Sequence, residues 1–579
     1  MYIAYKIKKL YMQRYNISSE QPLNHWLSIS LKISDNSSKH LNLSLAGWRP
    51  GRYEMAEYAS YIRNVKAFDK DGEDLSINKS DKNTWEIDHT PEELEIKYEF
   101  YAAQPDGGGS WLTPELIYLN FINFAFRVSG LEEEEIEVHL NIPVSFKIAT
   151  SLKVTDKRLI AKNYYELIDS PLFASEKISF SEYYVDETKF KIAFCGENSN
   201  PENWKNDFEK FTREHLDLFG EFPFKEYTFL ILGLPFQAYH GVEHNVSTII
   251  ILGPEKEIES TKYNDLLGVS SHELFHAWNV CRIRPVEMMP YDLSKENYHK
   301  TGYITEGFTT YYGDKILATS DVFSTEQFLE EINKMCKRHF QNEGRKHSSL
   351  SDSSFDLWVD GYRNRAPGRK VSIYVKGCLS ALALDLLILR NTKGEKSLDN
   401  AVRELWRAFG KTSLGYSEND ILQILNNVNA KNVSQEFYTL YHQTIPIENI
   451  LNPLLSHVGC KLKQQHSQLL NERKFGFRLS PDNSGKIIAI APGSPAESQL
   501  MIGDKIISIE NKSKDLAEYL SSDKDQDSLT LKYERFGIEY ETSLTSDGKT
   551  YYDWYKIEKN DSVSKDQKEM FKKWLKKEF

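Results

Sequence analysis

The sequence predicts a multidomain α+β protein, and three observations lead to this prediction. A chain of 579 residues is too long to fold around a single hydrophobic core. Residues 1–187 alternate apolar and polar side chains, which is typical of antiparallel sheets with one face in water. Residues 188–453 change to mixed and then helical periodicity, and short strand patterns return in residues 454–548. A short helical tail, residues 549–579, is expected to follow.

Composition and charge exclude several classes of protein. Hydrophobic residues make up 40% of the chain and charged residues 27%, as in ordinary globular proteins. The net charge of −12 argues against a nucleic-acid partner, which needs a basic surface. No apolar run is long enough to span a membrane, and residues 1–15 are basic but lack the apolar core of a signal peptide. A cytoplasmic location is therefore expected. The five widely spaced cysteines form no CxxC pair and are expected to be buried thiols.

The first predicted domain is an N-terminal antiparallel β domain, a sandwich or a saddle. Its alternating runs lie at residues 25–33, 41–45, 94–100 and 136–142. Turn residues rich in Asp and Gly separate these runs, as expected for strands joined by tight connections.

The central domain contains a metal-binding pattern. Residues 264–283 are largely apolar and free of proline, so they predict a helix. His272 and His276 are four positions apart, and both imidazoles therefore face one side of this helix and can reach one metal ion. Zinc prefers such nitrogen ligands, and Glu273 is placed to be the general base of a hydrolytic site.

Two open alternatives accompany this pattern. An HExxH pentapeptide arises by chance in a chain rich in His and acidic residues. Glu306 stands on a second predicted helix downstream and is available as a third ligand, but a solvated glutamate at the start of a helix is the other interpretation.

Residues 272–285, HELFHAWNVCRIRP, together with residues 305–312, TEGFTTYY, resemble the glycyl aminopeptidase family. These proteins are gluzincin metallopeptidases with a PDZ module at the C-terminal end. The resemblance implies a thermolysin-like catalytic domain over residues 188–453 and one zinc ion per chain, bound by His272, His276 and Glu306. Glu273 would then be the general base. A His, His, Glu set suits zinc best, although cobalt or manganese could occupy it.

Residues 238–251 predict a bend that leads into a strand. Gly241 and Glu243 are similar to an edge-strand element that holds the free amine of the substrate in related aminopeptidases, although this chain lacks the methionine found in larger relatives. A carboxylate that faces an ammonium group forms a charge-assisted hydrogen bond. The alternative is a glutamate in water at a strand edge.

Residues 372–389 predict a core helix that is apolar on nearly all sides. Its start resembles a Tyr-x-Lys-Gly element of gluzincin aminopeptidases. The implied role of Tyr374 is to donate a hydrogen bond to the oxyanion formed during peptide hydrolysis. The alternative is a tyrosine that anchors the buried helix through its hydroxyl group.

The C-terminal strands at residues 454–548 resemble a PDZ domain, with APGSPAE at residues 491–497 and GDKIISIENK at residues 503–512. Backbone amides around Phe475, Gly476 and Phe477 would bind a peptide carboxylate, unless the module only packs on the catalytic domain. In the tail, Met570, Phe571, Trp574 and Leu575 share one helical face, which predicts docking on the protein itself in preference to a membrane surface.

Together these observations predict a zinc aminopeptidase that acts on peptides with a free N-terminus, and the resemblance implies a preference for N-terminal Gly or Ala. Two alternatives remain at this point. One is a zinc endopeptidase with an open cleft, and the other is a peptide-binding PDZ adaptor with a vestigial metal site. The sequence leaves the oligomeric state open.

Overall fold

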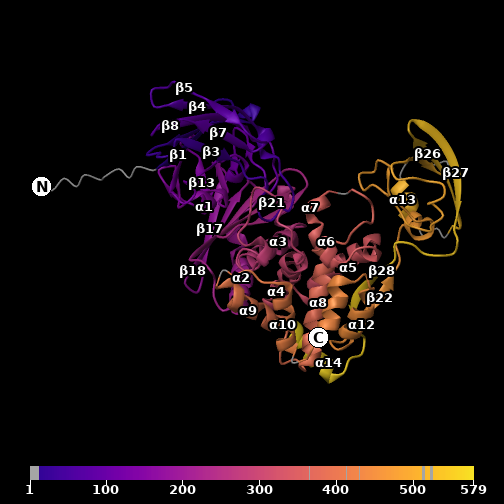
Figure 1. Ribbon diagram of the computed structural model, residues 1–579. Coiled ribbons are helices and arrows are strands. Elements are labelled where there is room, and N and C mark those ends of the chain that lie inside the picture. The colour runs from indigo at the N-terminus through magenta and orange to yellow at the C-terminus, as the bar shows by residue number, and fades with distance from the viewer. Residues whose placement is uncertain (1–11, 364, 413, 430, 511–515, 522–525) are drawn as a thin grey trace. The chain divides into compact units, whose positions relative to one another are not determined.

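The computed structural model describes residues 12–363, 365–412, 414–429, 431–510, 516–521 and 526–579. The chain forms two compact units (Figure 1). The first contains residues up to 324, 354–363 and 399–425, and the second contains residues 325–353, 364–398 and 426–579. The basic N-terminal segment and part of the 503–512 motif lie outside the described residues. The predicted division into four domains remains a prediction.

The N-terminal domain is β-rich, as predicted. Its main sheet, within the described residues, has eight strands in the order β14-β15-β12-β1-β2-β8-β4-β5. Their bounds are β14 (Lys153–Thr155), β15 (Arg158–Ala161), β12 (Ile136–Leu140), β1 (Gln13–Ser18), β2 (Trp26–Ile33), β8 (Leu94–Tyr101), β4 (Ile62–Asp69) and β5 (Asp74–Leu75). All neighbours pair antiparallel except β1 and β12, which run parallel.

The alternation of buried and more exposed side chains along the strands shows which face of the main sheet forms the core of this domain. In β2, Leu27, Ile29, Leu31 and Ile33 are buried, while the side chains between them are half-buried or exposed. Two four-stranded sheets complete the domain. The first contains β13 (Lys147–Thr150), β16 (Leu172–Ser175), β10 (Ile117–Leu119) and β9 (Trp111–Leu112), and the second contains β11 (Arg127–Val128), β3 (His40–Ser44), β7 (Thr84–Asp88) and β6 (Ile77–Lys79).

A five-stranded sheet follows in the same unit, in the order β17-β18-β19-β21-β20. The strands are β17 (Ile178–Val185), β18 (Thr188–Cys195), β19 (Glu226–Gly233), β21 (Ser247–Gly253) and β20 (Ala238–Glu243). The central strands β18, β19 and β21 are parallel and almost wholly buried, whereas β20 pairs antiparallel with β21 at the edge. The predicted strand that holds Gly241 and Glu243 is therefore an edge strand.

The helices of the described chain alternate between the two units. Their bounds are α1 (Tyr164–Ile168), α2 (Lys205–Phe219), α3 (Tyr263–His276), α4 (Thr309–Thr319), α5 (Thr325–Phe340), α6 (Leu350–Phe355), α7 (Leu357–Asp360), α8 (Val375–Asn391), α9 (Leu398–Leu405), α10 (Glu418–Asn429), α11 (Ser434–His442), α12 (Glu448–Ser456), α13 (Leu516–Ser521) and α14 (Lys565–Leu575). None of these helices combines the length and the apolar composition that crossing a bilayer requires.

The helix predicted over residues 264–283 is shorter in the structure, because α3 ends at His276. Asn279 explains this difference. Its amide nitrogen donates to the backbone oxygens of Ile304 and Thr305, at 2.8 and 3.3 Å. Those acceptors are distant in sequence, so a local pattern of apolar residues could not reveal that the chain leaves the helix here.

The second unit contains a small β module with its own hydrophobic core. Its strands are β23 (Phe477–Leu479), β24 (Ile487–Ile490), β25 (Lys505–Ile509), β26 (Ser528–Arg535) and β27 (Ile538–Thr545). The PDZ identity of this module remains a prediction. Outside it, β22 (Cys460–Gln465) pairs with β28 (Trp554–Lys559), so a strand lies within the segment predicted to be a helical tail.

Helix α14 docks on the second unit, as the tail pattern predicted. Phe571, Trp574 and Leu575 are buried, and the Trp574 ring lies 5.7 Å from Phe328 of α5 in an edge-on contact. A serine capping box, in which Ser564 and Gln567 bond to each other's backbone, starts the helix. The predicted thiols are also free, with four of the five buried and Cys281 half-buried.

We expect Trp574→Ala to lower the free energy of unfolding of the second unit by about 3–5 kcal/mol, because it leaves a cavity between α14 and α5. Urea unfolding followed by circular dichroism measures the change. Lys568→Ala, on the exposed face of the same helix, is the control and should stay within about 0.5 kcal/mol of the wild type. Equal effects of both changes would contradict the docking of α14.

Candidate metal centre

Helix α3 carries the first two candidate ligands and is held tightly by its neighbours. Ser271 Oγ donates to Gly313 O of α4 at 2.8 Å, and Phe275 stacks on Tyr312 with ring centroids 4.9 Å apart. A β-carbon on Gly313 would lie 3.2 Å from the backbone of His272. Helices α3 and α4 can approach this closely because residue 313 has no side chain.

Glu306 comes from a π-helical turn, Tyr303–Phe308, that runs directly into α4. Such turns occur often at functional sites, because the extra residue rotates one side chain out of the regular helical register. All six residues of this turn are buried. The turn thus brings a carboxylate to α3 from a segment well separated in sequence.

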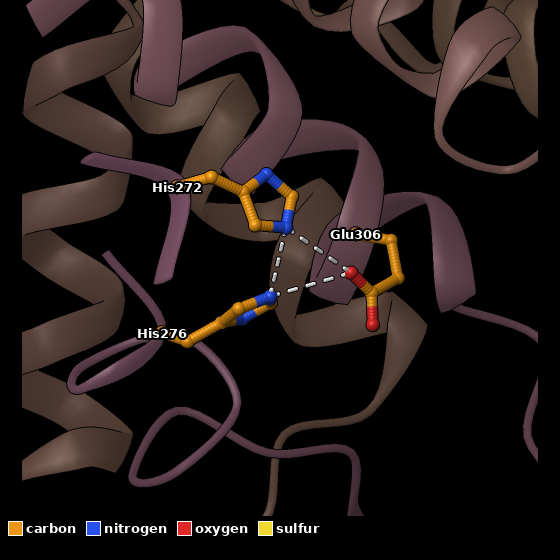
Figure 2. A group of neighbouring side chains, drawn as sticks. All are labelled: His272, His276 and Glu306. Carbon is orange, nitrogen blue, oxygen red and sulfur yellow. Dashed lines mark hydrogen bonds and ion pairs between the residues drawn. The ribbon is translucent and has the colours of Figure 1, made fainter. Parts of the chain in front are cut away.

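His272, His276 and Glu306 converge on one point (Figure 2). The two Nε2 atoms are 3.1 Å apart, and Glu306 Oε2 lies 3.8 Å from His272 Nε2 and 3.4 Å from His276 Nε2. Ligand atoms at the corners of a zinc tetrahedron with ordinary bond lengths are about 3.3 Å apart. The three donor atoms therefore fit one zinc ion.

The backbone of Asn279 fixes the orientation of the His276 ring. Its Nδ1 lies 2.6 Å from Asn279 O, and because a carbonyl only accepts, Nδ1 carries a hydrogen and Nε2 is the nitrogen that faces a metal. Asn279 in turn donates to Thr309 Oγ1 at 3.0 Å. The sequence analysis missed this residue, since its role appears only once residues 276, 304 and 309 are in contact.

Three carboxylates and the imidazole of His276 are buried together here, and His272 beside them is half-buried. The ligand atoms of Glu243, Glu273 and His276 lie within 4.8 Å of one another. Within the described part of the chain, Glu243 Oε1 and Glu273 Oε2 have no hydrogen-bond partner. Buried and unpaired carboxylates are costly, so this arrangement calls for a cation.

Burial and the charges of neighbouring groups also shift the pKa values of these side chains. Burial raises the pKa of Glu273 well above its usual range and also raises that of Glu306. Burial would lower the pKa of His276, but the surrounding carboxylates, Glu306 first, outweigh it and raise this pKa to about 10. Burial lowers the pKa of His272, so the two histidines differ in their protonation.

Two glycines make room for the carboxylates. A β-carbon at Gly241 of β20 would overlap Glu273 Oε1 and would lie 2.7 Å from Val269 Cγ2. A β-carbon at Gly51 would overlap Glu243 Oε2, and the backbone there has a φ of 77°, which favours glycine. Gly51 belongs to residues 48–53, WRPGRY, in the N-terminal β domain.

Gly241 and Glu243 are two positions apart on β20, so both face the same side of the edge strand. In the edge-strand element of related aminopeptidases the glycine and the glutamate are three positions apart, as Gly-x-x-Glu. Here they are two positions apart. Gly241 makes room for the candidate base Glu273, and Glu243 adds its own carboxylate beside it.

The remaining candidates lie in the second unit. Tyr374 directly precedes α8, and its role in the reaction remains a prediction. Phe475 ends a π-helical turn, Gly476 has a φ of 73° and donates its N–H to Asn471 O, and Phe477 begins β23. The amide of Gly476 is thus already engaged, and carboxylate binding by this loop also remains a prediction.

Comparisons with known proteins address the identity of the chain. The model of the peptidase M61 N-terminal domain matches residues 14–176, and that of M61 glycyl aminopeptidase matches residues 265–380. Both models are of the M61 family, so these two segments of the chain match that family. The matches confirm the resemblance noted in the sequence and support a zinc peptidase. The second match spans α3, the π-helical turn and Tyr374.

One solved structure similar to this chain shows its fold, and a second is similar over a smaller part. An aminopeptidase N family protein from Idiomarina loihiensis is 24% identical, with a TM-score of 0.88 over 97% of this chain and 100% of its own. An M1 zinc metallopeptidase from Deinococcus radiodurans is 15% identical, with a TM-score of 0.48 over 75% of this chain and 94% of its own. No curated protein matches the chain.

We expect Gly241→Ala to lower kcat about a hundredfold while zinc content is retained, because the added methyl group displaces the carboxylate of Glu273 and not a ligand. Peptide hydrolysis together with a metal assay measures both effects. Gly268→Ala is the matched control, since its nearest neighbour would be 3.8 Å away and alanine is the better helix former in α3. Equal activity of both variants would contradict the assignment of Gly241.

We expect zinc uptake by the metal-free protein to release protons at pH 7.5, because His276, with a pKa of about 10, must lose its Nε2 proton to bind. The apparent zinc affinity should therefore rise with pH and level off near pH 10. Titration calorimetry in buffers of different ionisation enthalpy counts the protons. In Glu243→Gln one carboxylate that raises this pKa is gone, so the affinity should level off at a lower pH.

Proposed function

We propose that the protein is a zinc aminopeptidase that removes the N-terminal residue of peptides. One observation carries this proposal. A second buried carboxylate, Glu243, lies beside the candidate base Glu273 and ligand His276 and has an oxygen without a partner among the described residues. An endopeptidase site has no need of this group, whereas an aminopeptidase must hold an ammonium ion next to the bond that it cuts.

The environment of Glu243 supports binding of a positively charged amine. Its side chain is only 6% exposed, so its negative charge is poorly solvated. A charge-assisted bond from the free N-terminus would supply about 1.5–3 kcal/mol, which favours free over blocked peptides about tenfold to a hundredfold. Among the described strands β20 pairs only with β21, so its other edge can also pair with the backbone of an extended peptide.

The base in this proposal is Glu273. When bound, zinc lowers the pKa of a water molecule and polarises the carbonyl group of the substrate. Glu273 takes the proton of the attacking water and later delivers it to the leaving amine. Its position against Gly241 keeps the carboxylate at the edge strand where the peptide would lie.

Further parts of the proposal come from the sequence. Tyr374 would donate its phenolic hydrogen to the oxyanion, a contribution that is typically about a hundredfold to a thousandfold in rate. Family resemblance implies N-terminal Gly or Ala. The C-terminal module would bind a peptide carboxylate at residues 475–477, and a cytoplasmic location is the prediction from composition.

The test is hydrolysis of free and N-acetylated alanyl and glycyl p-nitroanilides by the zinc-loaded protein. We expect cleavage of the free substrates only, and a loss of about a hundredfold to ten-thousandfold in kcat for Glu273→Gln with zinc still bound. Glu243→Gln should lose most of the preference for a free amine. Glu287→Gln, an exposed glutamate in the same unit, is the control and should behave as the wild type.

Two outcomes would contradict the proposal. If acetylation makes no difference, Glu243 binds no amine and the protein is an endopeptidase. If zinc is bound in stoichiometric amount but nothing is cleaved, the chain is a peptide-binding protein with an inactive metal site.

A further inference from the structure

A cavity of about 480 Å³ lies in the first unit beside Glu243. Glu243 and the two residues after it form one wall, the end of α1 forms another, and residues 280–284, which follow the metal-binding helix, form a third. Because Glu243 also lies within 4.8 Å of Glu273 and His276, the cavity opens next to the candidate metal centre. A peptide amine held by Glu243 would direct the first side chain of the peptide toward it.

Most of the wall is apolar. Ile122, Ile168, Val280 and Leu293 contribute aliphatic surface, and Tyr291 contributes an aromatic ring. A glycyl or alanyl residue would leave nearly all of this volume to water. A large apolar side chain would fill it, and each methylene group buried in such a pocket changes specificity about tenfold or more.

Several polar side chains interrupt this wall, and His244 is one of them. His244 is 8% exposed, and its Nδ1 lies 3.0 Å from Asp169 Oδ1, which fixes the ring. The carboxylate accepts the Nδ1 hydrogen, so in the neutral ring Nε2 is a hydrogen-bond acceptor. His244 Nε2 is buried and has no partner among the described residues, although His244 lines the cavity. The site therefore offers one oriented acceptor to a bound side chain.

Charged groups of both signs line the wall, with Arg49 and Arg284 beside the carboxylates of Glu133, Asp169 and Glu243. The Arg284 guanidinium donates to Val280 O and Cys281 O, at 3.1 and 2.9 Å, and lies 3.8 Å above the Tyr291 ring. Arg49 also lines the cavity, is 8% exposed and donates to Pro50 O.

The geometry points to a pocket for the N-terminal side chain that selects a large aromatic residue with a hydrogen-bond donor at its tip. Tyrosine is the amino acid that fits this description, with the phenol donating to His244 Nε2. This inference rests on the proposed aminopeptidase function, and it differs from the small N-terminal residues that the family resemblance implies. His244 is assigned as a specificity-determining residue and not as a catalytic one.

The test separates binding from turnover. Glu273→Gln, loaded with zinc, is titrated at pH 8 with the amides of tyrosine, phenylalanine, leucine, alanine, glycine, glutamate and lysine in a calorimeter. We expect tyrosine amide to bind about threefold to tenfold more tightly than phenylalanine amide, as one neutral hydrogen bond provides. Both should bind at least about tenfold more tightly than the alanine and glycine amides, because of apolar burial.

His244→Phe is the diagnostic variant. It keeps the size of the ring and removes the acceptor, and Asp169 keeps its bonds to Asn245 N and Nδ2, at 3.0 and 2.7 Å. We expect tyrosine and phenylalanine amides to bind equally to this variant. Leu293→Trp should weaken both relative to alanine amide by filling the cavity, whereas Val144→Trp, at a site that is 93% exposed, should leave the order unchanged.

The outcomes distinguish the proposed side-chain pocket from the proposed aminopeptidase function. Selective binding of tyrosine amide without hydrolysis of any p-nitroanilide by the wild type would support the pocket and contradict the aminopeptidase function. Cleavage of glycyl and alanyl substrates with no preference for aromatic amides would overturn the pocket alone. Tightest binding of glutamate amide would also overturn it, because the arginines and not His244 would then select the side chain.

Discussion

Negative charge buried around one point is the constraint on which the rest of the first unit depends. Glu243, Glu273 and Glu306 are buried around His276, and His272 beside them is half-buried. Such a cluster is unstable unless protons or a cation compensate it. Without a metal, a proton on His276 compensates part of this negative charge, as its raised pKa indicates. A zinc ion at the three donor atoms would compensate it instead.

The surrounding fold serves to hold this cluster in place. A π-helical turn brings Glu306 to α3, and Asn279 ties that turn to the end of the same helix. Glycines at positions 51, 241 and 313 let a loop, an edge strand and a second helix approach without side chains between them. Close approach of backbone is needed here because the carboxylates and imidazoles occupy the available volume.

The cavity beside Glu243 is the place where we infer that the first side chain of the substrate is selected. The chemistry of the metal centre acts on any peptide bond, so discrimination must come from the space next to it. In this chain that space is large, mostly apolar and marked by one histidine held by a carboxylate. Members of one family can share the centre and still differ in this wall, which is built from loops and helix ends.

The sequence by itself determined the α+β class of the fold and located the helix that carries two of the candidate metal ligands. Period-two alternation located strands such as β2 and β8, and the four-residue spacing of His272 and His276 on a helix is a local property. The paired motifs also identified the family. These features could be read because each depends on neighbours within one or two helical turns or one strand.

Only the tertiary structure decided where α3 ends, what residues 48–53 do and which side chains share the cavity. The end of α3 depends on Asn279 bonding to Ile304, Gly51 lies against Glu243, and His244 is fixed by Asp169. Each of these contacts joins segments between about 25 and 190 positions apart, and a local pattern holds no information on such partners. The physical reason is that packing and buried hydrogen bonds, and not propensity, select the conformation at these positions.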